Sequence, residues 1–213
     1  VLLLHLGAFF LVTGSVFKEM DWKLWWNTTL VASFIMILYS AFQLAGTIQI
    51  NQGGARVDGT LGNATYLAVY MLFHIFIALL FLWREKKNTS LRWIYTLLIL
   101  AQVWVLYHTA TRGAILGLIG GLLIVAILNV RNREDKWLRK ASIGVIGALV
   151  LIVGGVYLAR ESTFIKNSLV LSRFVNISTE ELKSGGRSFV WPMAIEGMKE
   201  RPLLGWGQDN FNY

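Results

Sequence analysis

The stretch WIYTLLILAQVWVLYHTATRGAILGLIGGLLIVAILNV, residues 93–130, decides the fold of this chain. Its one charged residue, Arg112, separates an uncharged run over 93–111 from a second over 113–130. About 20 consecutive apolar residues suffice for a helix to cross a bilayer. The stretch therefore predicts two membrane-spanning helices joined by a tight turn. We expect the arginine at that turn, because a charge is costly inside lipid and tolerated at its surface.

The composition of the whole chain extends this interpretation. Of its 213 residues, 55% are hydrophobic and 15% are charged, whereas soluble domains carry about 25% charged residues. We therefore predict an all-α, polytopic transmembrane helix bundle of about six spans in what we expect to be an internal fragment of a longer protein. The six apolar stretches lie at roughly 1–17, 28–50, 64–83, 93–110, 113–130 and 141–159.

The charged residues do not indicate a nucleic-acid-binding protein, although the net charge is +8. Most lysines and arginines form short islands beside apolar stretches, where such residues set topology and meet anionic lipid headgroups. Many of the nine tryptophans also lie near the ends of the stretches, as in an interfacial aromatic belt. The sequence contains no cysteine and no cluster of metal-ligating residues, so it indicates neither a disulfide framework nor a cofactor.

The basic islands predict the orientation of the spans. Residues 84–92 hold four basic residues and residues 131–140 hold five, which places both on the cytoplasmic side. Two spans separate them, as a common side requires, and the same alternation places 18–23 inside. Residues 51–63, the turn at 108–112 and everything after 160 are then expected outside.

Three arginines fall on this outer side, where topology does not require them. Arg112 precedes Gly113, Arg187 follows Gly186, and Arg56 lies two positions after Gly54. Glycine lets backbone N–H groups approach an anion closely. Guanidinium groups pair with phosphate oxygens in a two-pronged geometry. Together they indicate a site for an anionic ligand such as a lipid-linked pyrophosphate. The alternative is that each arginine snorkels to a headgroup or a loop carbonyl.

The tail after the last span predicts a short amphipathic helix over 188–200. Its apolar residues at helical spacing are Trp191, Ala194, Ile195 and Met198. Ser188 is expected to cap the helix, Pro192 to lie in its first turn and Pro202 to end it. The helix lies beside the outer mouth of the bundle or is an ordinary interfacial helix.

Glycine is also frequent in the last two spans. The residues are Gly113, Gly117, Gly120 and Gly121 in one span, and Gly144, Gly147, Gly154 and Gly155 in the next. Small residues let helix backbones approach one another within a membrane, so close packing is predicted there.

Three motifs together resemble the superfamily of O-antigen ligases and O-antigen polymerases, which are bacterial membrane glycan transferases. GARVDGTLGNATYLAVYML (54–72) is similar to the arginine-bearing G-T-x-G-N start of a span in that family. TATRGAILGL (109–118) resembles its S/T-R-G-A-x-x-G turn, and GGRSFVWPMAIEGMKERPLLGWGQDNF (185–211) resembles its outer loop. Each motif alone is weak, but together they occur in order and on the expected side.

The resemblance implies transfer of a glycan from undecaprenyl pyrophosphate to lipid A–core, a growing polysaccharide or a protein, without metal or nucleotide sugar. It also implies a multi-pass location in the bacterial inner membrane with a periplasmic active face. The domains expected are N-terminal spans over 1–53, the core transmembrane domain over 54–159 and the start of a large periplasmic loop over 160–213. The glycan, the acceptor and the distinction between ligase and polymerase stay open.

The resemblance assigns the pyrophosphate leaving group to Arg56, Arg112 and Arg187. The general base of the family is a histidine of the outer loop, expected beyond Tyr213, and His108 is the substitute within this chain. Further candidates for substrate binding are Asp58, which either orients Arg56 or is solvated, Trp191, and Asp209, which is expected on the acceptor side.

Two other classes of protein compete with the transferase. A small-anion transporter would also place arginines at a pore mouth, but it should carry ionisable residues or broken helices within its spans, and these spans are nearly free of charge. A structural or assembly membrane protein would have no requirement for the arginines.

Overall fold

The computed structural model describes residues 2–51, 54–131, 135–168, 170–172, 186–202 and 205–206, without the side chains of 2 and 186–189. Every regular element in these ranges is a helix, which confirms the all-α prediction. Five helices are long and apolar enough to cross a membrane: α2 (Glu19–Leu44), α3 (Ala64–Arg84), α4 (Thr89–His108), α5 (Arg112–Val130) and α6 (Lys136–Leu158). The shorter helices are α1 (Leu2–Val16), η1 (Gly59–Leu61), α7 (Thr163–Asn167) and α10 (Gly186–Glu200). The chain divides into two units, 1–155 and 156–213.

The second predicted span differs from the structure, whereas α1 covers most of the first, which was predicted at roughly 1–17. The helix α2 begins at Glu19 instead of residue 28, because the carboxylate of Asp21 accepts the backbone N–H of Lys18 at 2.9 Å and caps the helix. The run expected as a loop over 18–23 is therefore mostly helical. The same helix ends at Leu44, before Gly46 with φ of 77°.

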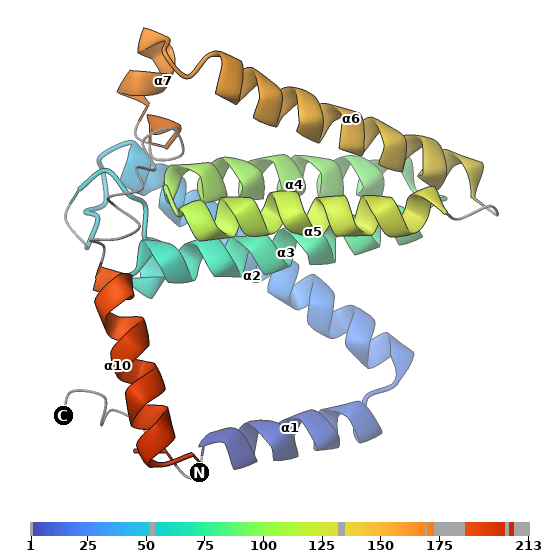
Figure 1. The fold of residues 1–213 in the computed structure, drawn as a ribbon. Helices are drawn as coiled ribbons and strands as arrows, with labels where there is room; N and C mark the ends of the chain where they lie inside the picture. The colour runs from blue at the N-terminus through green and yellow to red at the C-terminus, as the bar shows by residue number, and fades with distance from the viewer. Residues whose placement is uncertain are drawn as a thin grey trace. The chain divides into compact units, whose positions relative to one another are not determined.

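The helix α3 is the centre of the first unit. It packs against α2, α4 and α5 (Figure 1). Leu67, Met71 and Ile75 of α3 are fully buried, and they meet Val105 and Leu106 of α4 in the same apolar cluster. The core of the bundle therefore follows one face of α3.

Glycine brings α3 and α5 close together. A Cβ atom on Gly117 would lie 3.2 Å from Cδ2 of Leu72, and one on Gly121 would lie 2.5 Å from Cζ of Phe76. These two positions confirm the predicted packing through small residues. The glycines of α6 differ, because a Cβ at each would meet open space in the part of the chain that the structure describes.

Replacing Gly121 with leucine is expected to lower the free energy of unfolding by about 1–3 kcal/mol, because the ring of Phe76 must move and α3 must shift from α5. Thermal unfolding in detergent micelles, followed by tryptophan fluorescence, measures this change. Gly120→Leu is the matched control, since a Cβ there meets open space and both variants gain the same helix propensity. Equal unfolding temperatures would contradict the packing argument.

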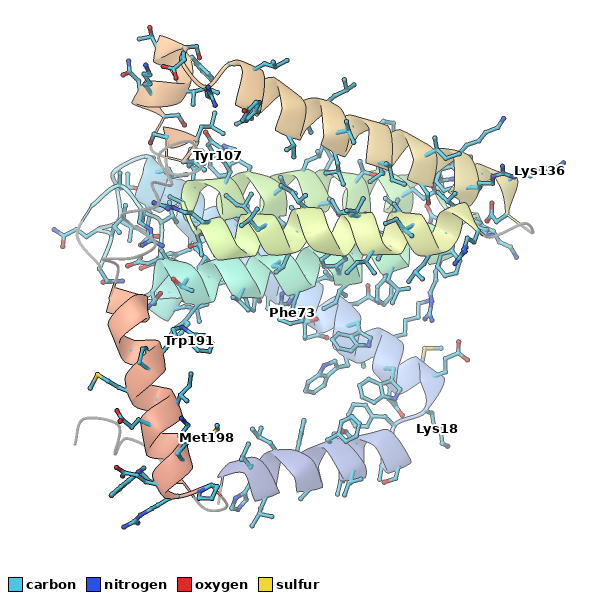
Figure 2. The ribbon with its side chains drawn as sticks, in the orientation of Figure 1. Lys18, Phe73, Tyr107, Lys136, Trp191 and Met198 are labelled. Carbon is cyan, nitrogen blue, oxygen red and sulfur yellow. The ribbon has the colours of Figure 1, made fainter. Side chains whose placement is uncertain are left out.

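The loops of the first unit sort to the two ends of the bundle as the charge pattern predicts. Lys86 of the α3–α4 loop lies 3.9 Å from Asp135 of the α5–α6 loop, measured between Nζ and Oδ2. Figure 2 shows Lys18 and Lys136 at this end and Tyr107 at the opposite one. We call the first the basic end. The other, which holds residues 45–51, 54–63 and the α4–α5 turn at 109–111, is the turn end.

Candidate functional site

The α4–α5 turn is short and conformationally unusual. Only Thr109, Ala110 and Thr111 separate the last residue of α4 from the first residue of α5. Ala110 has φ of 48°, a left-handed conformation that costs a residue with a Cβ about 1–2 kcal/mol. Thr109 and Ala110 are both buried. The turn therefore depends on its surroundings for its shape.

Arg56 provides part of these surroundings. Its Nε donates to the carbonyl oxygen of Thr109 at 2.9 Å, and its Nη2 donates to the hydroxyl of Thr111 at 3.1 Å. Beside it, the N–H of Val57 donates to the carbonyl oxygen of His108 at 3.3 Å. These bonds attach the loop before α3 to the turn and hold the guanidinium in a defined orientation.

The same bonds place positive charge at the beginning of α5. Thr111 is the N-cap residue but makes no capping hydrogen bond with its side chain, which is engaged with Arg56. Arg112 is the first residue of the helix. The N-terminus of a helix carries about half a positive charge and favours anions. Two of the three predicted arginines therefore meet at a helix terminus that favours a negatively charged ligand.

His108 lies at the same place, as the last residue of α4. Its half-buried ring is edge-on to Trp104 and to Tyr107, with centroid distances of 5.1 and 5.4 Å. The imidazole is thus near the arginines of the turn end, held by aromatic packing. Its role as a base stays a prediction.

Asp58 is buried, so the alternative that it is solvated is wrong. Its side chain has no exposed surface, and its Oδ1 accepts a hydrogen bond of 2.7 Å from Nε2 of Gln43. The same Gln43 nitrogen donates to the carbonyl oxygen of Gln49 at 3.0 Å, and its Oε1 accepts the N–H of Gly59 at 2.9 Å. Gln43 therefore holds both sides of the loop that carries Arg56.

The segment Gly59–Asn63 has a structural explanation at both glycines and at the asparagine of the G-T-x-G-N pattern. Gly59 has φ of 58°, and a Cβ there would lie 2.9 Å from Cε of Met36. Gly62 has φ of 65° and ends η1. Asn63 caps α3 by accepting the N–H of Thr65 at 2.8 Å. This motif thus shapes the loop that supports Arg56.

Replacing Ala110 with glycine is expected to raise the free energy of unfolding by about 0.5 kcal/mol, because glycine adopts a positive φ without steric cost. Ala114→Gly, in the first turns of α5, should instead lower it by about 1 kcal/mol. Thermal unfolding of both variants in micelles tests the opposite signs. A loss of stability for Ala110→Gly would argue against the left-handed turn.

The second unit holds the other predicted site residues. Helix α10 confirms the predicted helix but begins at Gly186, so Ser188 lies within it and Pro192 is in its interior. Arg187 is in its first turn, with a side chain outside the described residues. Trp191 is exposed. Asp209 lies outside the described residues, so its role and those of Arg187 and Trp191 stay predictions.

The structure adds three residues that the sequence analysis did not single out: Gln43, Thr109 and Thr111. Gln43 had a recognisable signal, because Ser33, Ser40 and Gln43 are polar, lie in an apolar stretch and share one buried face of α2. A polar residue at such a position usually has a specific partner. Thr109 and Thr111 had no such signal in the sequence, since a turn between two membrane spans is ordinarily polar.

The comparisons with known proteins identify the family of the chain. The family model of the O-antigen ligases matches residues 97–213, which include the α4–α5 turn, Arg112 and α10. Neither the search of curated proteins nor that of solved structures gives a match. The match covers more than half of the chain and comes with five apolar helices long enough to cross a membrane. The chain therefore belongs to the O-antigen ligase family, whose activity is that of a membrane glycosyltransferase.

Proposed function

We propose that this protein moves a glycan from undecaprenyl pyrophosphate to an acceptor hydroxyl or amide at the outer face of the bacterial inner membrane. The acceptor is lipid A–core, a growing polysaccharide or a protein. The observation that carries the proposal is the placement of Arg56 and Arg112 at the N-terminus of α5. The positive charge of an arginine and the partial positive charge of a helix N-terminus repel each other. A pyrophosphate bound between them would replace this repulsion with attraction to both.

Glycan transfer from a pyrophosphate donor requires positive charge near the leaving group. The acceptor attacks the anomeric carbon while the bond from that carbon to the phosphate oxygen breaks, and the electron pair stays on the departing pyrophosphate. The acceptor proton passes to a general base, for which His108 is the candidate within this chain. Prepositioned guanidinium groups stabilise the charge that develops on the leaving group, without a metal. Arg56 is suited to this role because its bonds to Thr109 and Thr111 fix its orientation in advance.

The experiment uses the full-length protein in liposomes with a polyprenyl-pyrophosphate oligosaccharide, a panel of acceptors and excess chelator. Release of polyprenyl pyrophosphate together with a glycosylated acceptor is the expected result. The same release should be lost in Arg112→Ala and Arg187→Ala. An arginine-dependent flux of small anions without any release would overturn the proposal in favour of a transporter.

A further inference from the structure

A second site lies at the opposite, basic end of the bundle. There α3, α5 and α6 enclose a laterally open cavity of about 440 Å³. We call it the lateral groove, and its lining comes from one face of each helix, between Phe76 and Trp83 on α3, Leu122 and Asn129 on α5, and Trp137 and Val145 on α6. Ile124, Leu128 and Lys140 fall within these limits but do not line the groove. The lining is mostly apolar, with Asn129 and Ser142 among its few polar residues. Its volume falls within the range of about 300–1,000 Å³ that is usual for sites binding small molecules.

The lateral groove continues into a charged cavity. This second cavity has a volume of about 290 Å³ and shares Leu82, Trp83 and Trp137 with the groove. Among the described residues, its other lining comes from Glu85, Lys86, Arg92 and Asp135. We call these four residues the charged mouth. The apolar lateral groove thus opens into a mouth with two acidic and two basic side chains. This arrangement is complementary to a lipid that has apolar chains and a zwitterionic headgroup.

The groove extends over about two thirds of the hydrocarbon of one leaflet of a bilayer. From Phe76 to Trp83 the helix α3 rises by seven residues, or about 10 Å at about 1.5 Å per residue. The hydrocarbon of one leaflet is about 15 Å thick, half of the bilayer core. Since the groove ends at the loops of the basic end, it faces the acyl chains of the leaflet on that side, and the charged mouth lies at headgroup level.

Backbone hydrogen bonds hold the side chains of the two acidic residues of the mouth in position. Oδ1 of Asp135 accepts the N–H groups of Trp137 and Leu138 at 3.1 and 3.0 Å, while its Oδ2 faces Lys86. Oε1 of Glu85 accepts the N–H groups of Asn88 and Lys87 at 3.0 and 3.1 Å. These two backbone bonds lower the pKa of Glu85 below its ordinary value, so its carboxylate is ionised at neutral pH.

We propose that the lateral groove and its charged mouth bind one glycerophospholipid with a primary-amine headgroup, a phosphatidylethanolamine. Lys86 and Arg92 meet the phosphate, while Glu85 and Asp135 accept hydrogen bonds from the ammonium group. An acyl chain of this lipid fills the lateral groove between α3, α5 and α6. An anionic lipid such as phosphatidylglycerol fits less well, because it has no cation for the two carboxylates. The bound lipid would fill space that α6 leaves open beside α3 and α5.

The test uses the whole protein in nanodiscs that contain a few mole per cent of phosphatidylethanolamine with a diazirine on one acyl chain. Illumination and peptide mapping then locate the cross-links. The expected result is labelling of groove residues at least about fivefold above that of Ile124 and Leu128, which are exposed on α5 outside the groove. Unlabelled phosphatidylethanolamine should displace the probe better than phosphatidylglycerol with the same chains.

Two variants and a matched control distinguish recognition of the lipid headgroup by the charged mouth from binding of the acyl chain in the lateral groove. Lys86→Glu with Arg92→Glu should abolish the excess labelling, whereas Lys87→Glu with Lys140→Glu makes the same charge change outside the cavities and should preserve it. Ala141→Trp fills the groove without a change in charge and should also abolish it. Labelling equal to that of Ile124 and Leu128 would show only annular lipid and overturn the proposal. If another segment of the protein occupied the groove and prevented its labelling by the lipid probe, that result would overturn the proposal as well.

Discussion

Arg112→Ala is expected to lower the rate of polyprenyl pyrophosphate release by about 10²–10³-fold, the effect of removing one prepositioned donor from a developing anion. The residue begins α5, one position after the threonine that Arg56 holds. Its loss removes positive charge where the leaving group is proposed to bind. Most of the effect should fall on kcat rather than on KM, because the negative charge on the departing phosphate grows in the transition state.

Steady-state kinetics in liposomes measure this effect, and two further variants define its cause. Arg112→Lys keeps the charge but loses the two-pronged geometry, so an intermediate loss is expected. Arg160→Ala is the matched control: this exposed arginine stacks over Tyr157 at 5.0 Å and belongs to none of the three motifs. A rate for Arg112→Ala within about twofold of the unmodified protein would remove the arginine from the mechanism.

Gln43→Leu is expected to lower the free energy of unfolding by about 3 kcal/mol, at about 1 kcal/mol for each of three hydrogen bonds. The substitution also releases the loop that carries Arg56, because it removes the amide that joins Gln49, Asp58 and Gly59. Glycan transfer should therefore fall even at temperatures where the protein remains folded. Thermal unfolding in micelles and the liposome assay report the two effects separately.

Gln102→Leu is the matched control for this prediction. Gln102 is also fully buried, but its Nε2 makes one hydrogen bond, of 2.9 Å to Ser33, and its Oε1 has no partner. Its loss should cost about 1 kcal/mol or less and leave transfer unchanged, since its partner Ser33 lies within α2 and not in the loop that carries Arg56. Equal effects of the two variants on transfer would mean that Gln43 acts only through general stability.

Hydropathy and charge alone predicted much of the fold. The spans expected at 64–83, 93–110 and 113–130 agree with α3, α4 and α5 to within a few residues. The prediction was wrong at α2 because a local cap by Asp21 extends the helix through a charged run. A window of apolar residues cannot detect such a cap. Only part of the site was predicted: Arg56, Arg112 and Asp58 were marked from the sequence, whereas Gln43 was missed although its position among polar residues of one face of α2 was a signal.

The sequence by itself determined the apolar spans of α3, α4 and α5 and the position of Arg112 at a turn, because helix length and burial in lipid depend on consecutive residues. The tertiary structure alone decided the hydrogen-bond partners of the polar side chains at the site. Arg56 binds Thr109 and Thr111 across more than 50 residues, and Gln43 binds Asp58 across 15. Such bonds form only after α2, α3 and α4 have packed around a common core, and no local pattern specifies which polar groups that packing brings together.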